Sequence, residues 1–299
     1  MRQAVLLLGH GAPERLEDVA AYLECVRGGR PAAPQLVAEF RSRYQQIGGS
    51  SPLLAVTRRQ AQALEQRLAS EGLPVRVYFG MRNWHPFVRE TLAEMQADGV
   101  RRIVAICLAP QYSKLSLGLY LHRTEEAKQE LGLDAEIVWT ESFHLHPLLI
   151  EAFYEKLRPL MGGRKVLFTA HSLPEEPLQS TDPYDAAARA TAAAVAARAN
   201  LTDWDFAYQS QGAIEGSWLG PTVESRIDRY AAEGIRELLL APIGFVSDHV
   251  EILYDVDILF RNYARERGIE LRRPGSLNDT PLFIAALSDV ARQGLEARQ

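Results

Sequence analysis

The sequence predicts an α/β protein built from two similar halves, each a doubly wound parallel sheet. Short apolar runs of strand length alternate with longer amphipathic stretches, and this order of elements repeats in the second half of the chain. Apolar runs separated by helical patterns are typical of parallel strands that are covered by helices on both faces. A chain of 299 residues is long enough for two domains of ordinary size, each with its own core.

In the first half, four apolar runs predict strands and two longer stretches with apolar residues at helical spacing predict helices. We expect these strands at 4–9, 75–80, 102–110 and 135–142, and the helices at 52–70 and 85–99. The second half repeats the pattern, with strands expected at 165–170, 204–210 and 236–242 and helices at 182–199 and 221–234. A Gly pair follows Met161, so we place the boundary there, giving domains 1–161 and 162–299, and expect the last helix to pack on the first domain.

Short motifs recur at matching places in the two halves. VLLLGHGAP (5–13) parallels VLFTAHSLP (166–174), and LAP occurs both at 108–110 and at 240–242. His10 and His171 therefore each follow the first strand of a half, where open parallel sheets bind ligands. We expect the halves to face each other across a cleft, with the two histidines approaching one ligand from opposite sides. The alternative is that each histidine is only a polar residue at a strand end.

Composition excludes several classes of protein. The net charge of -5 provides no general attraction to nucleic acid, and no apolar run approaches the roughly 20 residues that cross a bilayer. The start of the chain lacks the pattern of a signal peptide, so we expect a cytoplasmic protein. Cys25 and Cys107 form no CxxC motif, which argues against a disulfide scaffold or a site held by cysteines.

The segment PIGFVSDHVEILYDVD (242–257) carries an acidic cluster. If Ser247 or Asp248 caps a helix there, Asp248, Glu251 and Asp255 share one of its faces, and His249 points away from them. Apolar neighbours indicate partial burial, where carboxylates handle metals or protons, although a solvated acidic face is the alternative.

His171 and Glu251 together offer an imidazole and a carboxylate, which suit divalent iron, cobalt, nickel or zinc. A permanent catalytic metal normally has three protein ligands. This pair, with His10 on the opposite side, better suits a metal in transit.

Two Arg-Gly loops point to an anionic ligand. CVRGGRP supplies Arg27 and Arg30, and RSRYQQIGGSSPLL supplies Arg43, Tyr44 and Ser51 ahead of a helix. Arginine binds carboxylate or phosphate through two parallel hydrogen bonds, and helix starts also favour anions. Neither Gly pair fits a dinucleotide or P-loop motif. Ordinary exposed arginines are the alternative explanation.

Taken together, these motifs show that the sequence resembles the ferrochelatases, enzymes that insert ferrous iron into a porphyrin. The motifs that carry the resemblance follow the family's order over nearly the whole chain: RYQQIGGSSPL (43–53), LAPQYS (108–113), TAHSLP (169–174), WLGP (218–221) and PIGFVSDHVEILYDVD (242–257). The resemblance implies two flavodoxin-like halves around a cleft, the class II chelatase fold, and a lyase of haem biosynthesis.

The resemblance also implies roles for individual residues. His171 matches the family's active-site histidine and Glu251 its glutamate, which makes both catalytic and metal-binding. Asp255 matches the next acid along that helix, whereas Leu259 replaces a further acid of some members. His171 would accept protons from the porphyrin, and Glu251 would relay protons or the metal.

Arg27, Arg43, Ser51 and Tyr120 match positions that hold propionates in the bacterial branch acting on coproporphyrin III, and we add Tyr44 as a substrate contact. This match favours coproporphyrin III as substrate and coproheme as product. The cysteines that bind a cluster in some relatives are absent, so we expect no iron–sulfur cluster and no permanently bound cofactor, with Fe²⁺ as a substrate.

His10 departs from the resemblance, because that branch usually has tyrosine at this position. We expect His10 to be an axial ligand or metal donor. The His10-Gly11 pair is similar to a motif of the small cobaltochelatases, so a sirohydrochlorin cobalt or nickel chelatase stays an alternative, beside a protoporphyrin IX ferrochelatase and a non-catalytic tetrapyrrole-binding protein. We expect a monomer that contacts a downstream haem-pathway enzyme only transiently.

Overall fold

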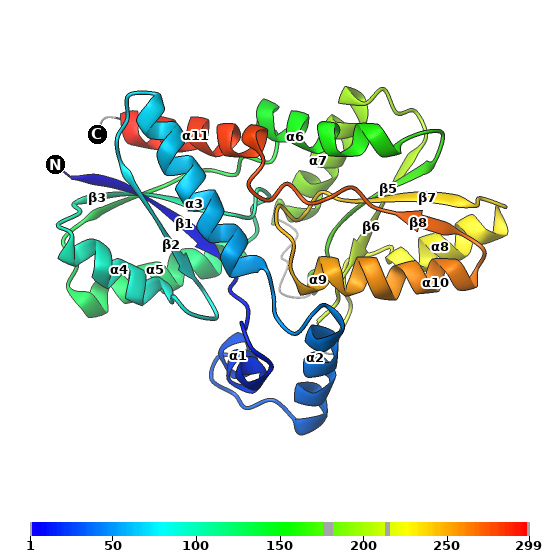
Figure 1. Ribbon diagram of the computed structural model, residues 1–299, viewed down its shortest axis with the longest axis horizontal. Helices are drawn as coiled ribbons and strands as arrows, with labels where there is room; N and C mark the ends of the chain where they lie inside the picture. Colours follow the sequence, from blue (N-terminus) through cyan, green and yellow to red (C-terminus); the bar gives the residue numbers. More distant parts are fainter. Residues whose placement is uncertain (1, 176–181, 213–215, 298–299) are drawn as a thin grey trace. The chain divides into compact units, whose positions relative to one another are not determined.

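The computed structural model describes residues 2–175, 182–212 and 216–297, which form two compact units (Figure 1). Unit 1 runs to Ala109 and adds Ser116–Ser142 and the stretch from Asn278 onward. Unit 2 consists of Pro110–Leu115 and Phe143–Leu277. The terminal helix therefore belongs to unit 1, and the helix that precedes residue 162 belongs to unit 2. No helix in the described ranges is long and apolar enough to span a membrane.

Unit 1 contains a parallel sheet of four strands in the order β2-β1-β3-β4. Its strands are β1 (Gln3–Gly9), β2 (Arg76–Met81), β3 (Arg102–Cys107) and β4 (Glu136–Trp139). Its helices are η1 (Leu16–Asp18), α1 (Val19–Val26), α2 (Pro34–Gln46), α3 (Leu53–Ser70), α4 (Val88–Ala97), α5 (Leu117–Leu131) and α11 (Pro281–Glu296). α3 and α11 cover one face of the sheet, and α4 and α5 cover the other (Figure 1). Being covered on both faces, the central strand β1 is apolar and fully buried from Ala4 to Leu8.

Unit 2 repeats this topology with the strand order β6-β5-β7-β8, again all parallel. The strands are β5 (Lys165–His171), β6 (Trp204–Gln209), β7 (Glu237–Pro242) and β8 (Glu270–Arg272). The helices are α6 (Pro147–Leu157), η2 (Arg158–Leu160), α7 (Tyr184–Arg198), α8 (Val223–Ala232), α9 (Val250–Leu253), η3 (Asp255–Phe260) and α10 (Arg261–Glu266). The prediction of two similar doubly wound parallel halves is confirmed. The cleft between them stays a prediction.

The strand order places a topological switch point beside the first strand of each unit. β1 lies between β2 and β3, and β5 lies between β6 and β7. Connections leave such a strand pair toward opposite faces of the sheet, which opens a crevice at the carboxyl ends. His10 follows β1 directly, and His171 is the last residue of β5. Both histidines therefore stand where this fold can bind a ligand.

Helices begin slightly later than the sequence predicts, because side chains cap them. α4 begins at Val88 rather than 85, since the Glu90 carboxylate accepts a hydrogen bond of 2.7 Å from the backbone N–H of Phe87. α8 begins at Val223, after Thr222, whose hydroxyl oxygen accepts from the backbone N–H of Ser225 at 3.2 Å.

The expectation of one helix carrying Asp248, Glu251 and Asp255 on a single face is wrong. α9 begins only at Val250, and its N-cap residue His249 is fully extended, with φ -160° and ψ -176°. Asp248 thus precedes the helix. From Asp255 the helix widens to π-helical geometry in η3, which changes the angular spacing of the side chains.

Asp248 has a role in the fold that the sequence does not indicate. Its carboxylate accepts a 2.7 Å hydrogen bond from the hydroxyl of Ser276 and lies 3.4 Å from the guanidinium of Arg273. These contacts tie the segment after β7 to the segment after β8.

Candidate active site

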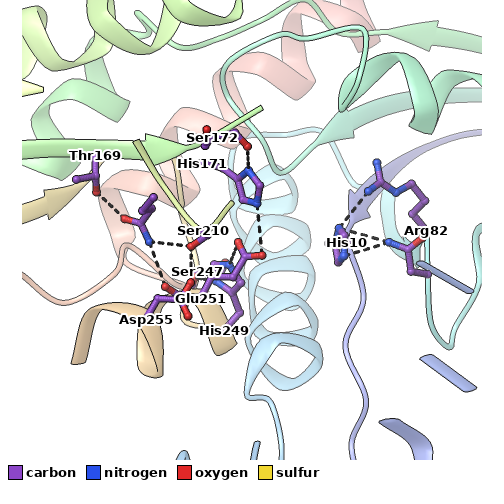
Figure 2. A network of polar contacts seen from close by, with 12 residues as sticks. His10, Arg82, Thr169, His171, Ser172, Ser210, Ser247, His249, Glu251 and Asp255 are labelled. Atoms are coloured by element: carbon purple, nitrogen blue, oxygen red, sulfur yellow. Dashed lines mark hydrogen bonds and ion pairs between the residues drawn. The ribbon is translucent and has the colours of Figure 1, made fainter. Parts of the chain in front are cut away.

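The candidate site of unit 2 contains His171, the last residue of β5, whose ring and backbone are each held by a hydrogen bond. Its Nδ1 makes a short hydrogen bond to the backbone carbonyl of Ser172. A carbonyl can only accept, so Nδ1 carries the hydrogen. The hydroxyl of Tyr184 donates to the carbonyl of His171 at 2.8 Å, which fixes the backbone. Nε2 then faces Glu251 Oε1 at 3.5 Å (Figure 2). Nε2 is thus the nitrogen that can take up a proton or a metal.

A second histidine approaches the same carboxylate from the other side. Nδ1 of His249 lies 2.9 Å from the carbonyl of Ser247, and its Nε2 lies 3.4 Å from Glu251 Oε2 (Figure 2). The expectation that His249 points away is wrong, because its backbone is extended rather than helical. A sequence signal existed: in extended chain, residues two apart share a side, and His249 stands two positions before Glu251.

Close packing of the chain brings Glu251 to His171. A Cβ added to Gly244 would lie 2.7 Å from the Cα of Ala170, closer than a side chain can approach. The backbone N–H of Gly244 donates to the carbonyl of Thr169 at 3.1 Å. The segment after β7 therefore lies directly against the end of β5, and only glycine permits this contact.

The pKa values of His171 and Glu251 are shifted in opposite directions. Burial alone would lower the pKa of His171, but the charge and hydrogen bond of Glu251, with help from Ser172 and Asp255, raise it above the ordinary 6.5. Burial alone would raise the pKa of Glu251, but His171 and His249 hold it well below the ordinary 4.5. The metal-free site is therefore an imidazolium–carboxylate pair at mildly acidic pH.

Behind this pair lies a polar layer that sequence reasoning missed. Gln209, which ends β6 and is only 2 % exposed, accepts from the hydroxyl of Thr169 at 2.6 Å and donates to the carbonyl of Glu251 at 3.1 Å. The hydroxyl of Ser210 donates to the carboxylate of Asp255 at 2.5 Å (Figure 2). Both residues stand at the end of the strand next to β5, which is the signal that could have found them.

In unit 1, His10 is exposed, and its ring lies beside two hydrogen-bond donors. Its Nδ1 is 3.2 Å from Arg82 Nη2, and its Nε2 is 3.1 Å from the amide nitrogen of Asn83 (Figure 2). Arg82 and Asn83 directly follow β2, and their backbone N–H groups donate to the carbonyls of Gly9 and His10. The pairing of β2 with β1 thus continues past the strand ends and fixes both side chains beside the ring. Sequence reasoning missed these two residues.

The structure places all five predicted substrate-binding residues in unit 1. Arg27 follows α1 and is half-buried. Arg43 lies in α2, and Ser51 lies just before α3, 8 % exposed. Tyr44 and Tyr120 are 1 % and 6 % exposed, so these two aromatic rings belong to the core.

Two of these residues also make local contacts. The guanidinium of Arg43 pairs with Glu39, one turn earlier in α2, at 2.5 Å. The hydroxyl oxygen of Ser51 accepts from the backbone N–H of Leu53 at 3.3 Å at the start of α3. Leu259, in η3, is 43 % exposed.

Within the described ranges, no group of three or more His, Cys, Asp or Glu side chains is arranged to hold a metal ion. His171 and Glu251, with His249 beside them, form an open and sparse donor set. Such a set can receive a metal and release it, and it can accept a proton.

Comparison with known proteins identifies the family. A family model described as Ferrochelatase matches residues 2–295. The chain belongs to the ferrochelatase family. It is 44% identical to a ferrochelatase of Acidobacterium capsulatum, covering 100% of this chain and 96% of that one. It is 34% identical to a coproporphyrin III ferrochelatase of Geobacillus thermodenitrificans, over 97% and 95% of the two chains.

Among solved structures, the fold of this ferrochelatase-family chain is similar to that of the sirohydrochlorin chelatase SirB of Bacillus subtilis, with a TM-score of 0.62. The alignment covers 99% of this chain and 96% of SirB at 12% identity. The predicted class II chelatase fold is therefore confirmed.

We predict that Glu251→Gln lowers the pKa of His171, because the largest charge that raises it is removed while burial, which lowers it, remains. Histidine proton NMR of the metal-free protein across pH measures this, with the His171 signal assigned by its loss in His171→Ala. Asp248→Asn is the control, since Asp248 is not among the groups that shift His171. An unchanged titration in Glu251→Gln would contradict the pairing.

Proposed function

We propose that this protein inserts Fe²⁺ into coproporphyrin III and releases coproheme, as a metal chelatase (a lyase) of haem biosynthesis. The observation that carries the proposal is Nε2 of His171, directed at the Glu251 carboxylate at the switch point of unit 2. Family membership supports metal insertion into a porphyrin. The coproporphyrin substrate is supported more narrowly, by relatives named for it at 33–34% identity and by the match of Arg27 and Arg43.

A free-base porphyrin has two inner N–H hydrogens that must leave as the metal enters. His171 accepts these protons at Nε2, because Nδ1 is committed to the carbonyl of Ser172. Glu251 receives the metal or passes the protons on, and Asp255 continues that path. Binding energy from the propionates holds the ring in a bent geometry that exposes its nitrogen lone pairs.

His10 completes the proposal as an axial ligand or metal donor on the other side of the ring. Iron is a substrate in this scheme, and the protein needs neither a permanently bound cofactor nor an iron–sulfur cluster. We propose a cytoplasmic monomer whose partners are the porphyrin, Fe²⁺ and, transiently, the enzyme that takes up the product.

One observation favours a second candidate. The His10-Gly11 pair is similar to a motif of the small chelatases that act on sirohydrochlorin. Insertion of cobalt or nickel into sirohydrochlorin is therefore the alternative function. Anaerobic incubation with each tetrapyrrole and each metal, followed by visible absorption, distinguishes the two functions.

We predict that His171→Ala abolishes iron insertion into coproporphyrin III while the protein still binds the porphyrin, because the proton acceptor is lost but the binding groups remain. Anaerobic titration with Fe²⁺ under visible absorption measures insertion, and quenching of porphyrin fluorescence measures binding. His122→Ala is the control, since His122 is an exposed residue of α5 that pairs only with Glu126 in the described contacts. Near-normal turnover by His171→Ala would refute its role.

We predict that Arg27→Ala and Arg43→Ala weaken binding of coproporphyrin III, which has four carboxylates, more than binding of protoporphyrin IX, which has two. A hydrogen bond to a charged group contributes about 1.5–3 kcal/mol, so each loss should be roughly ten- to a hundredfold in the dissociation constant. Arg59→Ala is the control, because Arg59 pairs with Asp279 at the surface. Equal losses for both porphyrins would argue against the coproporphyrin assignment.

We predict that His10→Ala or His10→Tyr keeps the fold but changes the absorption and resonance Raman spectra of bound ferric coproporphyrin, because imidazole binds haem iron more strongly than a phenol does. The insertion rate should fall far less than in His171→Ala, since proton removal does not use His10. Spectra identical to those of the wild type would show that His10 is not an iron ligand.

A further inference from the structure

Tyr120 is the residue to which family resemblance gives a propionate contact, yet its side chain is buried. Its exposed fraction is 6 %, and burial raises the pKa of its hydroxyl to about 12. The guanidinium carbon of Arg82 lies 4.8 Å from the centre of the Tyr120 ring. A ligand that approaches this part of unit 1 can therefore meet the guanidinium of Arg82, whereas the Tyr120 ring serves as the platform beneath it.

Arg82 is held in place before any ligand arrives. Its backbone N–H donates to the carbonyl of Gly9 at 2.9 Å, and its Nη2 lies 3.2 Å from Nδ1 of His10. The Tyr120 ring beneath the guanidinium further limits its position. Because these restraints already limit its rotamers, Arg82 loses little further conformational entropy when it binds a ligand.

Arg82 also differs from the neighbouring arginines Arg89 and Arg123, which each form an ion pair with a carboxylate. In the part of the chain that the structure describes, no carboxylate forms an ion pair with it. Arg89 pairs with Glu130 at 3.0 Å, and Arg123 pairs with Glu126 at 3.3 Å. Of the five N–H donors of the Arg82 guanidinium, only one makes a hydrogen bond to the residues that the structure describes.

Arg82 lines a groove of about 610 Å³ that lies entirely within unit 1. The walls come from the end of α1 and the Gly28-Gly29 turn that follows it, from residues 81–90, and from α5. Gly28 and Gly29 have positive φ angles of 67° and 84°, so a glycine turn forms this part of the wall. The volume is in the range of pockets that bind small organic ligands.

Acidic residues line this groove too, but most are already engaged. Glu130 and Glu126 pair with the arginines named above, and Glu90 accepts from the backbone N–H of Phe87 and contacts His85 at 2.9 Å. Glu24 stands on the exposed side of α1, where water screens its charge. The half-buried, uncompensated charge in this groove is therefore that of Arg82.

We propose that Arg82 binds a carboxylate of the porphyrin substrate, in the role that the family resemblance assigns to Tyr120. The inference rests on the proposed function and adds to it a residue that recognises the substrate. A guanidinium binds a carboxylate through two parallel N–H···O bonds, for which Arg82 has free donors and fixed orientation.

The test is the dissociation constant of metal-free coproporphyrin III, measured by fluorescence quenching for the wild type, Arg82→Gln, Arg82→Lys and Arg89→Gln. Without iron, any ligation by His10 does not contribute. We expect Arg82→Gln to weaken binding roughly ten- to a hundredfold and Arg82→Lys to give an intermediate loss, because lysine keeps the charge without the two-donor geometry. Arg89→Gln, in the same groove but already paired, should stay within about twofold of the wild type, as expected for an exposed ion pair.

Thermal unfolding of each variant shows whether the fold is kept, and Arg82→Lys supplies the milder change should Arg82→Gln unfold. If the wild type binds coproporphyrin III and both Arg82 variants bind it as tightly as the wild type does, the inference is overturned while the proposed function stands. An equal loss in Arg89→Gln would also overturn it, since the effect would then belong to the groove as a whole. If the wild type binds no porphyrin, both the function and the inference fail.

Discussion

The candidate site of unit 2 depends on the pairing of one half-buried carboxylate with two imidazole rings. Removing an ionised carboxylate from water is costly unless charged or hydrogen-bonded partners replace the water. Glu251 obtains these partners from His171 and His249, at 3.5 and 3.4 Å. Each ring is in turn oriented by a carbonyl that binds its Nδ1. The backbone therefore determines that Nε2 of each ring faces the acid. Nε2 is thus the nitrogen available for proton exchange.

The fold meets this requirement by bringing the ends of two strands together. Gly244 allows the chain after β7 to lie directly on the end of β5, and Gln209 anchors the carbonyl of Glu251 from the neighbouring strand. A side chain at Gly244 would separate the acid from His171. Local backbone geometry, more than the spacing of acids along a helix, thus determines the site.

The equivalent end of the sheet in unit 1 has the opposite electrostatic character. His171 ends β5 beside an acid, whereas His10 follows β1 beside Arg82 and Asn83, which offer hydrogen-bond donors. One topology therefore supports two kinds of chemistry. Under the proposed function, unit 2 handles protons and the metal, and unit 1 binds the carboxylates of the porphyrin.

The sequence predicted what depends on hydrophobic periodicity and repetition, and it failed where the backbone leaves regular geometry. The two sheets, their parallel strands and the positions of His10 and His171 follow from apolar runs and matching motifs. Helical spacing gives the wrong direction for the His249 side chain, because the backbone is extended at that residue. Gln209 and Arg82 carry no motif, and only the pairing of strands reveals their neighbours. Burial of Tyr44 and Tyr120 depends on tertiary packing, so residue type alone could not show it.

The raised pKa of His171 keeps a proton at the place where the proposed function brings a metal. At pH values below that pKa, the metal-free pair is an imidazolium and a carboxylate, and the stability that His171 contributes is lost as pH rises through its raised pKa. The contribution of Glu251 to stability has the opposite pH dependence. Because its pKa is lowered, this contribution is present above pH 4.5 and is lost as pH falls through the lowered pKa. Both contributions are fully present between 4.5 and 6.5, the ordinary pKa values of the two groups. Under the proposed function, a divalent cation at Glu251 lowers the pKa of His171 again, so the imidazolium loses its proton to water and Nε2 can accept a proton from the porphyrin. In that proposal, Glu251 pairs first with the imidazolium and then with the metal, which is a reason for a site with few ligands rather than a closed metal centre.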